Sequence, residues 1–280
     1  MKAAPRAFVI GHPIAHSRSP LIHGFWLEDN AAAGSYERID VAPDQLAGFV
    51  WGIADAGFAG GNVTVPHKSA VLGLVDEADE VARAIGAANT LWVEDGRVLA
   101  TNTDAVGFAH SLDAEAPGWD ASGGRAVVIG AGGAARAVVY ALLDRGFAVD
   151  VVNRGVERAE LLARAFGPRV KASGLPDVAA RLGAADLLVN TTSLGMSGSP
   201  PLDLDLAPLA RGALVCDIVY VPLETELLRR ARRAGHRTVG GLGMLLHQAR
   251  PGFVKWFGAR PRVSAELRAM IEQDLRAARR

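Results

Sequence analysis

The chain contains one cysteine, no long apolar run and no excess of either charge, and each of these shortages excludes a class of protein. A single cysteine, Cys216, cannot form an internal disulfide, which is typical of proteins that stay in a reducing compartment. No stretch approaches the roughly 20 apolar residues that a membrane-spanning helix needs, and the first residues do not form a secretory signal. We therefore expect a cytoplasmic protein without a membrane partner.

The charges and histidines argue against two further kinds of partner. The 30 acidic and 30 basic residues cancel, so no broad basic surface is expected for nucleic acid. The seven histidines fit no zinc spacing, and no cysteine or carboxylate completes a ligand set, so we expect no bound metal. With 280 residues, half of them apolar, the chain is long enough for two globular domains.

Lysine is also scarce, because only four of the 30 basic residues are lysines. Arginine does not release its proton in a protein, whereas a partly buried lysine can be tuned to exchange one. Lys68 closes the loop-like segment Gly60–Lys68, which contains asparagine, threonine and proline. Lys68 is therefore a candidate for proton transfer, although a solvated surface lysine would satisfy the same composition.

Apolar runs that alternate with helical patterns predict a mostly parallel α/β sheet in the first part of the chain. The predicted elements are listed by residue number: strands at 7–10, 36–41 and 60–65, helices at 19–30, 45–54 and 70–85, and a hairpin over 90–101. In the first helix, Ser19 is the expected N-cap and Pro20 the first helical residue.

A glycine-rich stretch at 114–124 is the best linker, and a second α/β pattern begins after it. We predict a substrate-binding domain at 1–112 and a Rossmann-type nucleotide domain at 118–241. From 242 onward the chain is expected to be helical, apart from residues 258–262.

The second domain carries a nucleotide-binding motif. Its residues, which follow a predicted strand and open a predicted helix, are Gly130, Ala131, Gly132, Gly133, Ala134 and Ala135. This run fits G-x-G-x-x-G/A, in which small residues let the backbone approach a pyrophosphate at the helix N-terminus.

The end of the next strand favours NADP over NAD. An NAD site usually has a carboxylate there for the ribose hydroxyls, but this chain has Asn153 and Arg154, with Arg158 one helical turn later. Two guanidinium groups would attract a 2′-phosphate and could bind it bidentately. Asp150 lies three residues too early to reach the ribose.

Uncharged hydrogen-bonding residues gather near the ends of the predicted strands in the first domain. These segments are His16–Pro20, Asn62–Lys68, Gly86–Thr90 and Thr101–Asp104. In parallel α/β sheets ligands bind at the carboxyl ends of strands, and such groups suit a small polyhydroxylated acid. Lys68 and Asp104 are the ionisable pair among them. Simpler roles are open for the individual residues, because a helix cap or a turn would also explain Ser19, Asn89 or Asp104.

Ordered motifs along residues 9–257 resemble those of the shikimate dehydrogenase family. They are Gly11-x-Pro13-x-x-His16-Ser17-x-Ser19-Pro20, Asn62-Val63-Thr64-x-Pro66-x-Lys68, Gly86-Ala87-x-Asn89-Thr90, Asn102-Thr103-Asp104-x-x-Gly107-Phe108, the glycine loop, Asn153-Arg154, Asn190-Thr191-Thr192-Ser193-x-Gly195-Met196, Asp217-x-Val219-Tyr220-x-Pro222 and Gly241-Leu242-Gly243-Met244-Leu245-x-x-Gln248.

This resemblance implies an NADP-dependent enzyme of aromatic amino acid biosynthesis that interconverts 3-dehydroshikimate and shikimate. It implies that Lys68 is the catalytic acid/base beside Asp104, and that the C-terminal helices return to the first domain. The substrate would be bound by Ser17, Ser19, Thr64, Lys68, Asn89, Asp104, Tyr220 and Gln248. The cofactor would be bound by Gly130, Ala131, Gly132, Gly133, Ala134, Asn153, Arg154, Arg158, Ile218 and Gly241, with Glu80 as a further contact.

Three positions depart from the family pattern, which commonly has Asn, Thr and Asp where this chain has Gly24, Gly155 and Gly240. Three other functions stay open on the sequence: a related dehydrogenase for quinate or aminoshikimate, a non-catalytic sensor of nucleotide and metabolite, and a methylene-tetrahydrofolate dehydrogenase. The chain is expected to be a monomer or a homodimer.

Overall fold

The computed structural model describes residues 4–121 and 123–278 and divides the chain into two compact units. The first unit comprises Met1–Asp104 and Leu246–Arg280, and the second comprises Ala105–Leu245. The boundaries fall at or within two helices, α4 (Asp104–Glu115) and α9 (Leu242–Phe257). The ends of the predicted first domain, 1–3 and 279–280, lie outside the described residues.

The first unit contains a six-stranded sheet in the order β2-β1-β3-β5-β6-β4. Its strands are β1 (Arg6–Gly11), β2 (Ser35–Asp40), β3 (Gly60–Val63), β4 (Glu77–Ala78), β5 (Thr90–Glu94) and β6 (Arg97–Thr101). The pairs are parallel except that β5 runs antiparallel to both of its neighbours. This reversal brings the start of β5 to the edge at which β3 and β6 end, with Thr90 opposite Asn62 and Thr101.

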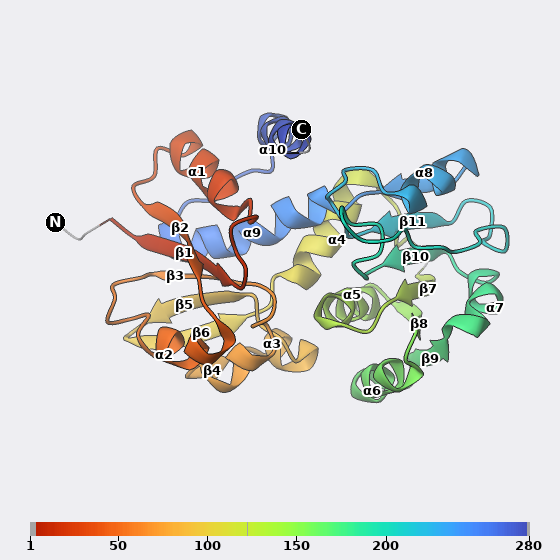
Figure 1. Cartoon of the computed structure of the whole chain (residues 1–280), viewed down its shortest axis with the longest axis horizontal. Coiled ribbons are helices and arrows are strands. Elements are labelled where there is room, and N and C mark those ends of the chain that lie inside the picture. Colours follow the sequence, from red (N-terminus) through yellow and green to blue (C-terminus); the bar gives the residue numbers. More distant parts are fainter. Residues whose placement is uncertain (1–3, 122, 279–280) are drawn as a thin grey trace. The chain divides into compact units, whose positions relative to one another are not determined.

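Helices cover both faces of this sheet, as Figure 1 shows. They are α1 (Ser19–Asp29), α2 (Leu46–Trp51), α3 (Glu80–Ile85), α9 and α10 (Ala265–Ala277). Phe8 and Ile10 of β1 point into one apolar cluster with α2 and α3, in which Leu46 and Ala82 are buried. The opposite face packs against α1 and α9, where Tyr36 of β2 contacts the ring of Trp256.

Two of the predicted local structures in this unit are wrong. The predicted helix 70–85 is instead a 3-10 turn (Ala70–Gly73), the short strand β4, and helix α3, which Asp79 caps. Pairing with β6 decides this, because the carboxylate of Asp76 accepts the N–H of Val98 at 2.7 Å. Ser19 is not an N-cap, since α1 begins at Ser19 and the cap position has no side-chain hydrogen bond.

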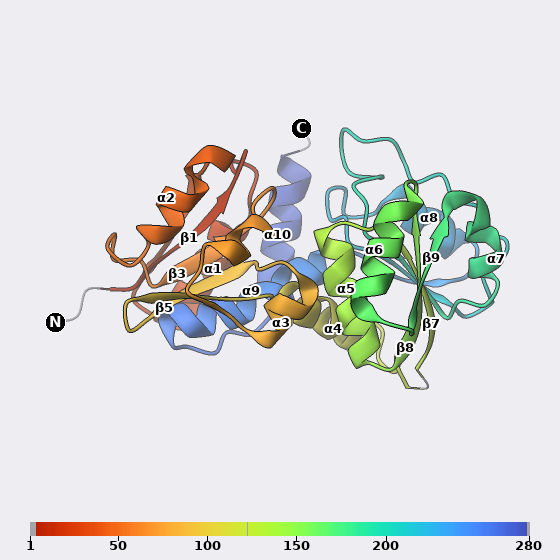
Figure 2. The ribbon, with the colours of Figure 1, turned by 90° about the horizontal axis from the view of Figure 1, so that it is seen from below.

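The second unit is a doubly wound Rossmann-type domain (Figure 2). Its parallel strands are β7 (Gly124–Ile129), β8 (Phe147–Asn153), β9 (Val170–Gly174), β10 (Leu187–Asn190), β11 (Leu214–Asp217) and β12 (Arg237–Val239), in the order β12-β11-β10-β7-β8-β9. Its further helices are α5 (Gly133–Asp144), α6 (Val156–Phe166), α7 (Val178–Leu182) and α8 (Glu226–Arg233). Strand order reverses between β7 and β10, and ligands bind at such switch points.

The segment predicted as a linker, 114–124, lies inside the second unit, apart from Ser122, which is not among the described residues. Arg145 donates to Asp113 and Asp120, and its guanidinium lies over the ring of Trp119. These contacts explain how a glycine-rich stretch is held in place. In the described part of the chain, no helix is long and apolar enough to cross a membrane.

Candidate active site

Lys68 and Asp104 form an ion pair in the first unit. The distance from Lys68 Nζ to Asp104 Oδ2 is 2.6 Å, and the two side chains are 22% and 7% exposed. Asp104 is the first residue of α4, where free backbone N–H groups favour a negative charge. Asn102 Oδ1 accepts the Asp104 N–H at 2.9 Å, and the Asp104 carboxylate accepts hydrogen bonds from the side chains of Lys68 and Asn89. The carboxylate is therefore available to hold the lysine.

Asn89 and Gln248 complete this polar cluster. The amide nitrogen of Asn89 donates to Asp104 Oδ1 at 2.9 Å and to Gln248 Oε1 at 3.0 Å. Asn89 precedes β5 and Gln248 lies on α9, so residues distant in sequence meet at one edge of the sheet. Of the predicted substrate residues, Lys68, Asn89, Asp104 and Gln248 are brought together.

Ser17 and Ser19 lie in the loop after β1 and at the start of α1. Ser17 Oγ accepts the Ser19 N–H at 3.3 Å, and Ser19 is 7% exposed. Arg38 fixes this loop, because its Nε and Nη2 both donate to the Ser17 carbonyl, at 2.8 and 2.7 Å. The two serines, on a loop whose backbone is fixed in this way, can offer their hydroxyl groups to a carboxylate.

Thr64 follows β3, next to the end of β1. Its N–H donates to the Ile10 carbonyl at 2.9 Å. A Cβ at Gly11 would lie 2.6 Å from Thr64 Cγ2, so only glycine permits this close approach. The first two sequence motifs are therefore adjacent in the fold.

The predicted pyrophosphate loop connects β7 to α5 in the second unit. Gly130 has φ +111°, and a Cβ there would lie 2.6 Å from Thr191 Oγ1. At Gly132 and Gly133 a Cβ would meet nothing within 4 Å, and no side chain caps α5. Open space before an uncapped helix N-terminus fits a phosphate group, so Gly130, Ala131, Gly132, Gly133 and Ala134 suit the role predicted for them.

Arg154 and Arg158 are exposed beyond the end of β8. Within the described part of the chain neither guanidinium makes an ion pair, so both are available for an anion. Asn153 Nδ2 donates to the Gly155 carbonyl at 2.8 Å and fixes the turn between them. Asp150 is buried in β8 and bonds Arg125 at 3.1 Å, away from this turn.

Ile218 and Gly241 are neighbours in the second unit. A Cβ at Gly241 would lie 2.1 Å from the Ile218 carbonyl oxygen, so the two backbones are in direct contact. Asp217 holds this region, because its buried carboxylate accepts from Asn190, Val219 N–H and Thr225 at 3.0, 3.0 and 2.7 Å. None of these three partners carries a positive charge. Burial therefore raises the pKa of the Asp217 carboxyl above its ordinary value.

Glu80 and Tyr220 belong to different units, and their predicted roles remain predictions. Glu80 is the exposed first residue of α3. Tyr220 follows β11.

Packing does not dictate glycine at the three positions that depart from the family pattern. A Cβ at Gly24 would meet nothing within 4 Å. At Gly155 and Gly240 the nearest atoms would be Glu157 Oε2 and the Leu223 carbonyl oxygen, each at 3.4 Å.

Tyr36 was missed as a site residue by the sequence reasoning. Its hydroxyl donates to Asn62 Oδ1 at 2.6 Å, and Asn62 in turn bonds Thr90. Tyr36 lies on β2, 32 residues before Lys68, and belongs to no motif. The weak signal in the sequence is that tyrosine is rare, with three in the chain.

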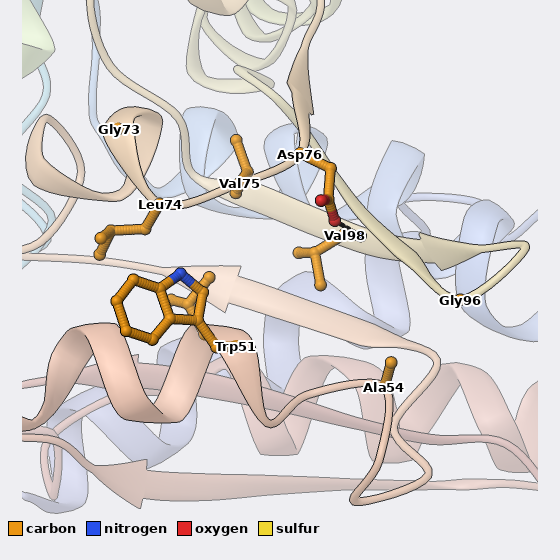
Figure 3. A pocket seen from close by; sticks show the side chains of 9 residues that line it. Trp51, Ala54, Gly73, Leu74, Val75, Asp76, Gly96 and Val98 are labelled. Atoms are coloured by element: carbon orange, nitrogen blue, oxygen red, sulfur yellow. Dashed lines mark hydrogen bonds between the residues drawn. The ribbon is translucent and has the colours of Figure 1, made fainter.

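Two cavities lie apart from these residues. One, of about 300 Å³ in the first unit, has the exposed Trp51 facing Leu74, and Asp76 turned toward Val98 (Figure 3). The other, of about 550 Å³ in the second unit, is lined by Arg211, Arg230 and His236 among others. Neither contains a predicted site residue. In the described segments, no three or more His, Cys, Asp or Glu side chains are grouped to hold a metal ion.

Comparison with known proteins gives consistent matches. Residues 9–91 match the family described as shikimate dehydrogenase substrate binding domain, and residues 114–196 match shikimate / quinate 5-dehydrogenase. Relatives named shikimate dehydrogenase (NADP(+)) include that of Azorhizobium caulinodans, 58% identical with 97% of each chain covered, and that of Methylocella silvestris, 57% identical with 99% covered.

Solved structures agree with these matches. Shikimate 5-dehydrogenase from Thermus thermophilus, in complex with NADP(H) and shikimate, is 37% identical, with a TM-score of 0.86 and coverage of 98% of this chain and 99% of that one. Quinate dehydrogenase from Corynebacterium glutamicum, in complex with NAD, is 32% identical, with a TM-score of 0.88 and coverage of 96% and 99%.

Proposed function

Because the chain belongs to the shikimate dehydrogenase family and is an NADP-dependent oxidoreductase acting on a CH–OH group, we propose that Lys68 is its acid/base residue. The reaction is the reversible reduction of 3-dehydroshikimate to shikimate. The observation that carries the proposal is the 2.6 Å contact between Lys68 Nζ and Asp104 Oδ2 in a largely buried polar cluster.

The side chains around this pair suit the substrate. Ser17 and Ser19, with the backbone held by Arg38, would hold the carboxylate, and Thr64 lies at the neighbouring strand end. Asn89, Asp104 and Gln248 would order the ring hydroxyls through their amide and carboxylate groups.

The second unit would hold the cofactor through the glycine loop and the free guanidinium groups of Arg154 and Arg158. When bound, NADPH would supply a hydride to the ring carbon of the ketone, and NADP+ would accept a hydride from the alcohol in the reverse direction. In the reducing direction Lys68 donates a proton to the carbonyl oxygen as it becomes a hydroxyl, and in the oxidising direction Lys68 takes that proton back. Asp104 fixes the position of the Lys68 amine in both directions.

Replacing Lys68 by methionine tests this role. General acid–base catalysis contributes about 100- to 10,000-fold, so we expect Lys68→Met to lower kcat by about three orders of magnitude while KM for shikimate changes far less. NADP reduction followed by absorbance gives both constants. Lys171→Met removes an exposed lysine on β9 and is the matched control, expected to leave kcat unchanged. A Lys68→Met enzyme with near-normal kcat would refute the assignment.

Substrate preference, location and assembly are parts of the proposal that need separate tests. Rates with shikimate and quinate, each with NADP and NAD, distinguish a shikimate enzyme from a quinate enzyme. We propose a cytoplasmic protein, since its Cys216 is buried and unpaired, and a monomer or homodimer, which light scattering would decide.

A further inference from the structure

Every polar atom of Asn89 is hydrogen-bonded within the first unit. Its N–H donates to the Thr101 carbonyl at 3.1 Å, and its carbonyl accepts from Val63 N–H at 2.9 Å and Asn62 Nδ2 at 3.1 Å. Its side-chain nitrogen uses both hydrogens, on Asp104 and Gln248. The residue that touches the catalytic carboxylate is thus fixed from all sides.

The orientation of this amide is determined by a donor that cannot reverse. Asn89 Oδ1 accepts the backbone N–H of Thr103 at 2.8 Å, and a backbone N–H only donates. The oxygen must therefore face Thr103, and the nitrogen must face Asp104.

A second set of donors supports the same oxygen from the other side. Tyr36 Oη donates to Asn62 Oδ1 at 2.6 Å, and Asn62 Nδ2 donates to Thr90 Oγ1 at 3.2 Å. Thr90 Oγ1 then donates to Asn89 Oδ1 at 3.0 Å. Thr90 Oγ1 also lies 3.1 Å from Thr103 Oγ1, which in turn lies 3.1 Å from Asn89 Oδ1. The Thr90 hydroxyl therefore links the Tyr36–Asn62 contact to the amide oxygen of Asn89.

We propose that Thr90 is a positioning residue for the reaction, because its hydroxyl transmits the Tyr36–Asn62 contact to the Asn89 amide and so keeps Asp104 aimed at Lys68. Thr90 itself is fully buried and touches neither member of the pair. The inference rests on the proposed function, since it takes Lys68 and Asp104 as the reacting groups.

Thr90→Val tests this role, since valine keeps the shape and strand preference of threonine and removes only the hydroxyl. We expect kcat to fall by about tenfold, as loss of one buried hydrogen bond at a catalytic carboxylate implies, with KM for shikimate and Kd for NADP nearly unchanged. The hydride step should become slower relative to product release, so the isotope effect measured with deuterated NADPH should increase. Thr90→Ser restores the hydroxyl and should restore kcat.

Thr101→Val is the matched control. Thr101 faces Thr90 across the β5–β6 pair and is 8% exposed, but its hydroxyl makes no hydrogen bond within the described residues. This variant should keep normal kcat. Tyr36→Phe keeps the ring and removes the first donor, and we expect a smaller loss of kcat, which provides a test if Thr90→Val does not fold.

Thermal melting of each variant separates folding from positioning. The proposal is overturned if Thr90→Val and Tyr36→Phe keep kcat and the isotope effect of the parent enzyme, or if Thr90→Ser and Thr101→Val lose as much activity as Thr90→Val. Lys68→Met distinguishes the two levels: if it is inactive while Thr90→Val is normal, the proposed function stands and only the positioning role fails. If Lys68→Met is active, the proposed function itself fails.

Discussion

His23 should make the stability of the first unit depend on pH. Its ring is fully buried and stacks on Tyr36, with centroids 4.0 Å apart and planes 14° apart, and Trp26 and Phe253 pack around it. Neither ring nitrogen has a hydrogen-bond partner in the described structure. Burial lowers the pKa of His23 from 6.5 to about 3, although the nearby Asn62 side chain slightly favours the protonated ring without reaching hydrogen-bond geometry.

The size of the effect follows from this pKa. The unfolded chain takes up a proton at His23 below about pH 6.5, while the folded protein does not until about pH 3. The contribution to stability is therefore complete above pH 6.5 and is lost as the pH falls from 6.5 toward 3. At pH 5, which is about 1.5 pH units below the ordinary pKa of histidine, protonation of the unfolded chain lowers the free energy of unfolding by about 2 kcal/mol.

The comparison of parent protein with His23→Phe isolates this contribution. Phenylalanine keeps the stacking and removes the two ring nitrogens, which have no hydrogen-bond partner in the described structure. Between pH 7.5 and pH 5 the free energy of unfolding of the variant should therefore fall by about 2 kcal/mol less than that of the parent. Urea unfolding followed by tryptophan fluorescence suits the test, because four of the five tryptophans, all except Trp119, belong to the first unit. Equal losses in the two proteins would show that burial does not hold His23 neutral.

Two further substitutions test the ligand sites. Arg154→Gln combined with Arg158→Gln should raise KM for NADP by about 100-fold and leave KM for NAD nearly unchanged. The reason is that two charge-assisted contacts to the 2′-phosphate, of about 1.5 kcal/mol each, would be lost. An equal effect on both cofactors would contradict the assignment. Arg38→Met should raise KM for shikimate several-fold with kcat retained, because the Ser17 carbonyl loses both of the donors that fix its loop. Steady-state kinetics at low and high salt checks this. An unchanged KM would exclude a role for Arg38 in positioning the Ser17 loop.

Much of the fold could be predicted because its signals are local. The strand before Gly130 and the helix after it follow from apolar runs and glycine alone, and the ring of polar segments follows from strand ends in an α/β pattern. The contact between Lys68 and Asp104, which the family resemblance implied, is present at 2.6 Å.

What could not be predicted depends on contacts between distant segments. The stretch 70–85 has a helical pattern, yet pairing of β4 with β6 outweighs that local preference. The placement of Thr90 beside Asn62 depends on the antiparallel direction of β5, which no local pattern specifies. Tyr36 lies on β2 and reaches Asn62 on β3 across the intervening strand β1, so its contact with the site has no signature in the sequence.

The first unit is discontinuous in sequence, and this has a consequence for the order in which the protein is made. Three side chains that hold the first unit together are translated after the entire second unit. They are Gln248, which bonds Asn89, Trp256, whose indole donates to the Leu91 carbonyl at 2.8 Å, and Asp274, which pairs with Arg18. On the ribosome, residues 4–104 therefore emerge with α1 but not α9 on one face of their sheet, and the 141 residues of Ala105–Leu245 are made before the first unit continues. A ribosome that stops after Leu245 would release a chain with every residue of the nucleotide unit but without Gln248 and the rest of α9, which completes the catalytic cluster.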